Sequence, residues 1–234
     1  MNIIITGASS GVGFEAVLEL ILTGDHKVVA LARSEDKLGR LLEIAQGLNP
    51  DCILYPVAFD IVHDDYADLL QFISARLDNR VDILINNAGV LINKPFADLL
   101  ETDFVEMIQS NFIGHVRIMQ NLLPLMPAGA HILNIGSMGG FQGSTKFAGL
   151  SAYSASKGAL HILTECLAQE LTDRQIKVNC LALGSAQTEM LEKAFPGHES
   201  PVLAFEMGKY IADFALTGHK FYNGKILPVA VTTP

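Results

Sequence analysis

The chain has 234 residues, of which 50% are hydrophobic and 18% are charged, and its formal net charge at pH 7 is −9. This length fits one domain of the larger kind, and the apolar content supports a buried core and excludes an intrinsically disordered chain. The net negative charge argues against a nucleic-acid binder, whose usual feature is a basic patch, and against an anionic membrane surface as a partner.

The sequence carries no clear signal for a metal, for export or for a membrane. Cys52, Cys166 and Cys180 are scattered in apolar segments, which favours buried thiols in a reducing compartment. No Cys/His cluster has metal-ligand spacing, so we expect no metal. The segment MNIIIT does not resemble a signal peptide, and no apolar run reaches membrane-spanning length. We therefore expect a cytoplasmic protein.

In chain order, short apolar runs alternate with longer amphipathic runs. The predicted strands are residues 2–6, 27–32, 52–58, 81–86, 130–136, 176–183 and, weakly, 225–229. Most are apolar throughout, as strands buried on both faces are. The predicted helices are residues 11–23, 34–47, 63–78, 98–126, 152–172 and 203–217.

This alternation predicts an α/β fold, a doubly wound parallel sheet with helices on both faces. No linker, internal repeat or low-complexity tract divides the chain, so we expect a single domain over residues 1–234. Residues 138–151 form a predicted glycine-rich loop, and residues 184–202 form a second irregular segment. Long loops in compact domains are often functional.

The stretch TGASSGVG follows the first predicted strand and opens the first predicted helix. Glycines let the backbone turn sharply and let a phosphate approach the N–H groups, and a helix N-terminus adds partial positive charge. A tight turn without a ligand would show the same glycines. The position of the stretch favours a dinucleotide site made by Gly7, Ser9, Ser10, Gly11, Val12 and Gly13.

The second predicted strand ends in ALARSEDK, where Arg33 and Ser34 follow the strand. Sites that prefer NAD usually place an acidic residue near here, whereas an arginine suits the 2′-phosphate of NADP. A solvent-facing arginine at the start of a helix is the alternative. We predict that NADP(H) is preferred over NAD(H).

Two further strands end in polar residues. Asp60, after the third strand, could accept a hydrogen bond from the adenine amino group or cap the helix predicted at residue 63. The fourth strand ends in Asn86, Asn87, Ala88 and Gly89, which would let a flat ligand lie on the backbone or would form an asparagine-rich turn. Ligands of such sheets bind outside the carboxyl ends of the strands.

A possible acid/base device lies in SAYSASKGAL, where Tyr153 and Lys157 are four residues apart and share a helix face. A free tyrosine has a pKa of about 10, and a nearby ammonium would lower it. Ser137, at the end of the fifth strand, could hydrogen-bond a substrate carbonyl. Singly, each residue is better explained as a surface or turn residue; together, at one sheet edge, they favour proton transfer coupled to hydride transfer.

The motifs TGASSGVG, NNAG, NIGS and YSASK, in this order, resemble the short-chain dehydrogenase/reductase family in its shorter single-domain branch, from Met1 to about Thr188. The resemblance implies a Rossmann-type sheet and NAD(P)(H)-dependent oxidation of alcohols or reduction of carbonyls. It implies Tyr153 as the acid/base, Lys157 as pKa modulator and ribose ligand, and Ser137 as the group that positions the carbonyl. It adds Asn111, in QSNFIG, as a fourth catalytic residue that helps hold a water-linked proton relay.

The resemblance also implies cofactor contacts from Asp60, Asn87, Ala88, Gly89, Gly184 and Thr188, and a substrate lid around residues 184–203. The sequence departs from the family where Leu183-Gly184 replaces the usual Pro-Gly, which we expect to loosen the turn that holds the nicotinamide. The C-terminal FYNGKILPVAVTTP also lacks the usual glycine-rich ending. Family members often form dimers or tetramers, so a homodimer or homotetramer is expected.

The expected activity is NADP(H)-dependent reduction of a small-molecule carbonyl, or oxidation of the alcohol. A protein of the same fold that senses dinucleotide or acts as a scaffold without turnover is the alternative, although such a protein would not need Ser137, Tyr153 and Lys157 together. An epimerase or dehydratase of the extended branch would usually need a longer chain.

Overall fold

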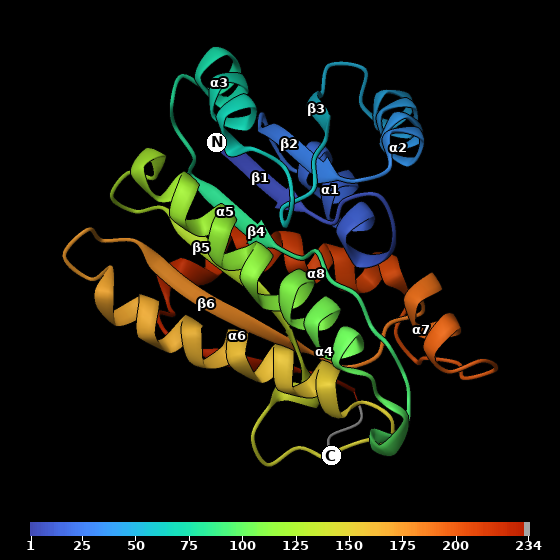
Figure 1. Ribbon diagram of the computed structural model, residues 1–234. Coiled ribbons are helices and arrows are strands. Elements are labelled where there is room, and N and C mark those ends of the chain that lie inside the picture. Colours follow the sequence, from blue (N-terminus) through green and yellow to red (C-terminus); the bar gives the residue numbers. More distant parts are fainter. Residues whose placement is uncertain (232–234) are drawn as a thin grey trace.

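The computed structural model describes residues 1–231, and its centre is a parallel sheet in the order β3-β2-β1-β4-β5-β6-β7 (Figure 1). The strands are β1 (Asn2–Thr6), β2 (Lys27–Ala32), β3 (Ile53–Ala58), β4 (Ile83–Asn86), β5 (His131–Ser137), β6 (Lys177–Leu183) and β7 (Ile226–Val229). The predicted doubly wound parallel sheet is confirmed. Pro56 lies within β3, at an edge of the sheet, where its missing N–H is tolerated.

The sheet separates two apolar cores, because successive side chains of a strand point to opposite faces. Ile3 and Ile5 of β1 face the core made with α1 (Gly11–Leu22), α2 (Glu35–Leu48) and α8 (Ala204–Thr217). Ile4 faces the core made with α3 (Tyr66–Leu77), α5 (Gly114–Leu122) and α6 (Ser151–Glu170). Figure 1 shows α4 (Glu101–Ile108), α5 and α6 in front of the sheet and α8 behind it.

The helix predicted over residues 98–126 is interrupted. A 3₁₀ turn (Phe96–Asp98) comes first, then α4 (Glu101–Ile108), a π-helical turn (Gln109–Ile113), α5 and a second 3₁₀ turn (Leu123–Leu125) that contains Pro124. In the π turn the Gly114 N–H donates to the Gln109 carbonyl. Single π turns inside helices are frequent at functional sites, and this one carries the buried Asn111.

Three other predictions need correction. Residues 184–202 are not irregular throughout, since they contain the short helix α7 (Glu189–Ala194). Helix α3 starts at Tyr66 rather than at residue 63, because the Asp65 side chain caps it by accepting from the Ala67 N–H. Cys166 is exposed and only Cys180 is fully buried. Within residues 1–231 no helix is long and apolar enough to cross a membrane.

The strand order places the functional residues. The chain runs from β1 outward to β3, then crosses to β4 on the other side of β1 and proceeds to β7. The connections that leave β1 and β4 therefore diverge at their carboxyl ends. In open parallel sheets such a reversal opens a crevice for ligands.

Candidate functional site

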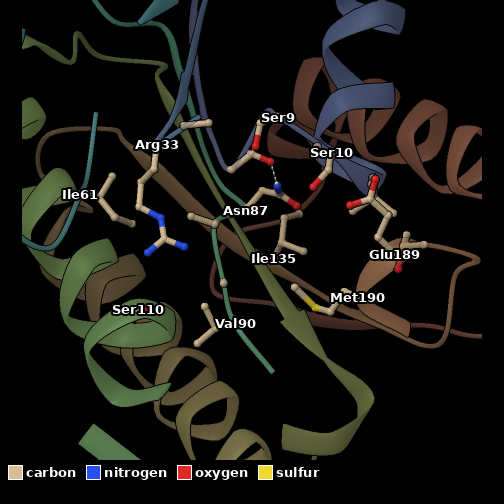
Figure 2. A pocket seen from close by; sticks show the side chains of 18 of the residues that line it. Ser9, Ser10, Arg33, Ile61, Asn87, Val90, Ser110, Ile135, Glu189 and Met190 are labelled. Carbon is tan, nitrogen blue, oxygen red and sulfur yellow. Dashed lines mark hydrogen bonds between the residues drawn. The ribbon is translucent and has the colours of Figure 1, made fainter. Parts of the chain in front are cut away.

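A cleft of about 540 Å³ runs along the carboxyl edge of the sheet (Figure 2). Most of the predicted site residues line it: Gly7, Ser9, Ser10, Gly11, Val12, Gly13, Arg33, Ser34, Asp60, Asn87, Ala88, Gly89, Ser137, Tyr153, Lys157, Gly184 and Thr188. Asn111 does not line the cleft and lies behind it. Figure 2 shows Arg33 and Ile61 on one side, and Glu189 and Met190 on the other.

The glycine turn packs directly against the loop that follows β4. Gly7 has φ +68°, and a Cβ there would come within 2.6 Å of the Ala88 Cα. A Cβ on Gly13 would come within 2.2 Å of the Asn87 Nδ2 and 2.5 Å of the Gly7 carbonyl oxygen. These distances exclude any side chain at the two positions, so glycine is required for the two loops to meet.

Hydrogen bonds hold the same two loops together. The Thr6 Oγ1 accepts from the backbone N–H groups of Asn87 and Ala88, each at 3.0 Å. The Asn87 Nδ2 donates in return to the carbonyls of Thr6 and Gly7, at 3.0 and 3.1 Å. The side-chain amide nitrogen of Asn87 is therefore bonded to the glycine turn. Asn87 shapes the cleft by fixing the backbone of the loop after β4.

Arg33 leaves the end of β2 with an exposed side chain, and Figure 2 shows its guanidinium pointing into the cleft. Ser34 caps α2, since its hydroxyl accepts from the Lys37 N–H at 3.4 Å. Lys37 forms an ion pair with Glu189 of α7, at 3.0 Å. This pair joins α2 to the segment predicted as the lid.

Asp60 lines the cleft and does not cap α3, whose cap is Asp65, so the capping interpretation is wrong and the contact to adenine stays a prediction. Its Oδ1 accepts from the Val62 N–H at 2.8 Å, and its Oδ2 lies 3.2 Å from the His63 Nδ1. Burial alone raises the pKa of the Asp60 carboxyl, but the Val62 N–H and the positive charges of His63 and Arg33 hold it below its ordinary value. The carboxylate is therefore ionised at the edge of the cleft.

Ser137 and Tyr153 come together from β5 and α6. The Ser137 Oγ accepts from the Gly139 N–H at 3.1 Å, which fixes the hydroxyl in the turn after β5. Burial raises the pKa of the Tyr153 phenol, and its hydrogen bond with Ser137 offsets part of this rise. Burial is the larger influence, so the pKa of the phenol lies above its ordinary value, and a lowering of that pKa by Lys157 stays a prediction.

Lys157 is 4% exposed, and its Nζ donates to the Ile135 carbonyl at 2.8 Å. A Cβ on Gly89 would come within 3.5 Å of this Nζ, so the ammonium lies between β5 and the loop after β4. Burial lowers the pKa of Lys157 to about 8. The side chain is one helical turn from Tyr153, as predicted.

Asn111 links three segments from the π turn. Its Oδ1 accepts from the Val90 N–H at 2.8 Å, and its Nδ2 donates to the Val90 carbonyl at 2.9 Å. The Nδ2 also donates to the Ser156 Oγ at 2.9 Å, and that hydroxyl donates to the Tyr153 carbonyl at 2.7 Å. Asn111 therefore ties the loop after β4 to the turn of α6 that carries Tyr153.

The turn after β6 is joined to β7. Leu183 is buried and pairs with Val229 of β7, and the Gly184 N–H donates to the Val229 carbonyl at 2.8 Å. The looser turn expected from Leu183-Gly184 stays a prediction. Thr188 caps α7 by accepting from the Leu191 N–H at 3.2 Å. Residues 232–234 of the atypical C-terminus lie outside the described residues.

Three residues that hold the site in place were not among the predicted site residues: Thr6, Ser156 and His115. Thr6 belongs to the quoted glycine motif, and Ser156 to the YSASK motif, so both could have been considered. His115 is fully buried, and its Nε2 lies 2.8 Å from the Ala88 carbonyl. Burial lowers the pKa of His115 to about 3, so it donates as a neutral ring.

Replacing Thr6 with Val tests the junction of the two loops. The variant leaves the N–H groups of Asn87 and Ala88 without their shared acceptor, and each orphaned donor costs about 1–3 kcal/mol. We expect Thr6→Val to lower the free energy of unfolding in urea by roughly 2–4 kcal/mol and to weaken NADPH binding, measured by fluorescence titration. Thr6→Ser keeps the acceptor and should bind as wild type; equal binding by Thr6→Val would show that Thr6 does not shape the cleft.

Comparison with known proteins agrees with this geometry. A family model described as short chain dehydrogenase matches residues 1–199. An uncharacterized oxidoreductase of Staphylococcus aureus (strain N315) is 30% identical over 222 residues, covering 94% of this chain and 92% of the relative. The structure of levodione reductase superposes with a TM-score of 0.85 at 22% identity, covering 98% of this chain and 95% of that one.

A short-chain dehydrogenase from Shigella flexneri 2a strain 301, complexed with NADP, superposes with a TM-score of 0.84 at 26% identity, covering 97% of this chain and 95% of that one. The match to the family model and the 30% identical relative together cover most of the chain. The chain belongs to the short-chain dehydrogenase/reductase family, whose members are oxidoreductases that bind a nicotinamide dinucleotide.

Proposed function

We propose that this protein is a carbonyl reductase that uses NADPH, with Tyr153 as the proton donor. The observation that carries the proposal is the cleft in which a dinucleotide cradle and the set Ser137, Tyr153 and Lys157 lie together. The cradle fits the cofactor: Gly7 and Gly11 have φ of +68° and +57°, and glycine at these positions lets a pyrophosphate approach the backbone N–H groups at the start of α1.

Each residue near the reacting carbonyl has a defined task. A bound reduced nicotinamide supplies a hydride to the carbonyl carbon. Tyr153 gives its phenolic proton to the carbonyl oxygen, so that C=O becomes CH–OH, and Ser137 donates a hydrogen bond to the same oxygen. Lys157, held by the Ile135 carbonyl, places a positive charge beside the place where the phenolate forms and where the ribose would lie.

Tyr153 can serve as the proton donor at neutral pH, because burial raises the pKa of its phenol and the proton stays on it. The direction of reduction is proposed from Arg33, since a guanidinium suits the 2′-phosphate of NADPH, the reduced form that serves reductases.

Residues 184–203 serve as the substrate lid in this proposal. Helix α7 is tied at its start by the Glu189–Lys37 ion pair and at its end by the Asn93 Nδ2, which donates to the Ala194 carbonyl at 2.7 Å. Met190 of α7 lines the cleft together with Val90 and Ser110. These three side chains are the candidates for contacts to the substrate beyond its carbonyl group.

Turnover of Tyr153→Phe tests the reaction. NADPH oxidation on a panel of ketones and aldehydes should fall by about 10²–10⁴-fold without the phenolic proton, while the dissociation constant for NADPH stays the same. Equal rates for Tyr153→Phe and wild type would remove the assigned acid. Binding of NADPH by wild type without turnover of any carbonyl would instead support a dinucleotide sensor.

Cofactor preference follows from Arg33. Loss of a charged hydrogen bond to phosphate costs roughly 1.5–3 kcal/mol, so Arg33→Ala should weaken NADPH binding by about 10–100-fold. Binding of NADH, which lacks the 2′-phosphate, should not change and serves as the internal control. Tighter NADH binding by wild type, or an unchanged preference in Arg33→Ala, would contradict the assignment.

The pH dependence of cofactor binding follows from Lys157. Its pKa of about 8 means that the ammonium is present below pH 8 and is lost as the pH rises through that value. NADPH affinity, titrated by fluorescence between pH 6 and 10, should therefore decline through about pH 8. Lys157→Arg keeps its charge over this range and should show no such decline; a flat wild-type profile would oppose a role for the ammonium in binding.

A further inference from the structure

The connection between β3 and α3 forms one wall of the cleft, and a side chain outside the cleft holds it in place. Phe59, Asp60, Ile61 and Val62 line the cleft from this connection. Ile61 is 6% exposed, and its side chain lies on the same side of the cleft as Arg33 in Figure 2. Because Arg33 is proposed to bind the 2′-phosphate, the adenosine half of the dinucleotide would lie along this wall, and the proposal below rests on the proposed function.

Tyr66, the first residue of α3, stands behind this wall. It is 5% exposed, and its hydroxyl donates to the Ile61 carbonyl at 2.8 Å. Its ring packs edge-on against Phe59, with centroids 5.0 Å apart. Burial raises the pKa of the Tyr66 phenol well above its usual value, although Arg117 opposes the rise, so the hydroxyl remains a donor.

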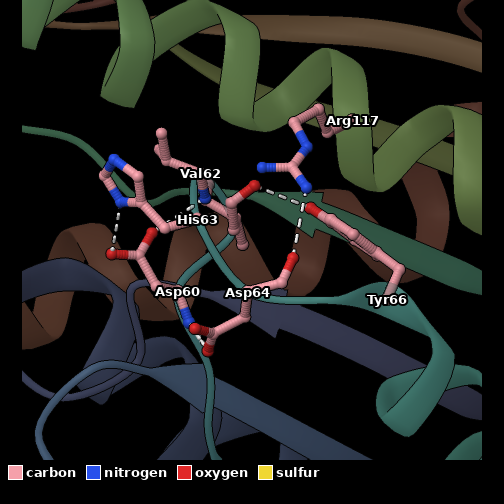
Figure 3. Close-up of polar contacts among 7 residues, drawn as sticks. Asp60, Val62, His63, Asp64, Tyr66 and Arg117 are labelled. Atoms are coloured by element: carbon pink, nitrogen blue, oxygen red, sulfur yellow. Dashed lines mark hydrogen bonds and ion pairs between the residues drawn. The ribbon is translucent and has the colours of Figure 1, made fainter.

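Arg117 of α5 holds both Tyr66 and the loop. Its guanidinium carbon lies 5.2 Å from the centre of the Tyr66 ring, within the range of a cation–π contact. Its Nη2 donates to the Asp64 carbonyl at 3.1 Å. The Asp64 Oδ2 in turn accepts from the Asp60 N–H at 2.8 Å, so the chain of contacts reaches the residue at the cleft edge (Figure 3).

The same helix touches the loop one turn earlier. A Cβ on Gly114 would come within 2.8 Å of Ile61 and 3.1 Å of Val62, so the loop packs onto α5 at that glycine. Helix α5 therefore meets the connection at two levels, first by close packing and then through the Arg117 guanidinium. Arg117 itself does not belong to the cleft lining.

We propose that Arg117 is a positioning residue for the adenosine half of the cofactor, acting through Tyr66 and Asp64 on residues 59–64. A loop that is already ordered before binding loses less conformational freedom when the ligand arrives, and affinity rises accordingly. Without the guanidinium, residues 59–64 would become ordered only when the ligand binds, and the free energy needed to order them would weaken binding. The proton-transfer residues on β5 and α6 are not part of this chain of contacts.

The experiment measures binding of two fragments, 2′,5′-ADP and 5′-ADP, together with intact NADPH, by isothermal titration calorimetry. Arg117→Met keeps an unbranched apolar stem but removes the charge and the donor. The matched control is Arg76→Met, which removes a second guanidinium stacked on a tyrosine, 5.8 Å from the Tyr55 ring centre and outside the cleft lining.

Arg117→Met should raise the dissociation constants of both fragments by the same factor, about three- to tenfold, as expected for one cation–π contact and one hydrogen bond. The KM for NADPH should rise by that factor, while kcat at saturating NADPH stays within about twofold of wild type. Arg117→Lys, which keeps a cation and a donor, should recover part of the affinity, and Arg76→Met should bind all three ligands as wild type.

Unchanged fragment affinities in Arg117→Met would overturn the proposal. So would a fall in kcat at saturating NADPH, or an equal loss in Arg76→Met, because both would indicate general destabilisation. Failure of the cofactor assignment looks different: wild type would then bind 5′-ADP as tightly as 2′,5′-ADP. In that case the equal loss of both fragments in Arg117→Met would still support Arg117 as a positioning residue.

Discussion

The site depends on the close contact between the turn after β1 and the loop after β4. Gly7 and Gly13 leave no room for a side chain at this contact, and Thr6 and Asn87 close it with reciprocal hydrogen bonds. The contact lies where the strand order reverses, so the cleft opens beside it. A side chain at either glycine would push the loops apart and displace Ala88 and Gly89 from the cleft.

A second constraint is the buried charge of Lys157. A buried ammonium needs acceptors, and the Ile135 carbonyl supplies one at the end of β5. The ammonium then lies against Gly89, and the π turn at Asn111 ties the same loop to α6 through Val90 and Ser156. The proposed acid/base residues and the proposed dinucleotide cradle are thus held by one connected set of contacts rather than by separate elements.

The sequence predicted the sheet, its parallel connections and 17 of the 31 residues that line the cleft, because apolar strands and glycine turns are local patterns. It did not predict the π turn, since Asn111 reads as a polar residue inside a long helix until its partner Val90, 21 residues away, is in place. The raised pKa of Tyr153 could not be predicted from the sequence either, because the burial of a side chain depends on the whole fold. The attachment of the turn at Leu183 to β7 depends on the pairing of β6 with β7, which a weak strand pattern could not reveal.

The proposed role of Arg117 could not be predicted from the sequence either, since its contacts with Tyr66 and Asp64 join residues about 50 positions apart.

The central claim is that hydride and proton reach one carbonyl in this cleft, and isotope transfer tests it most directly. NADPH carrying deuterium at either C4 position of the nicotinamide is incubated with the wild-type protein and a carbonyl substrate found by screening. The account predicts an alcohol with one deuterium on the former carbonyl carbon, from one of the two labelled cofactors only. An alcohol that forms without deuterium from both, while NADPH is consumed, would contradict it.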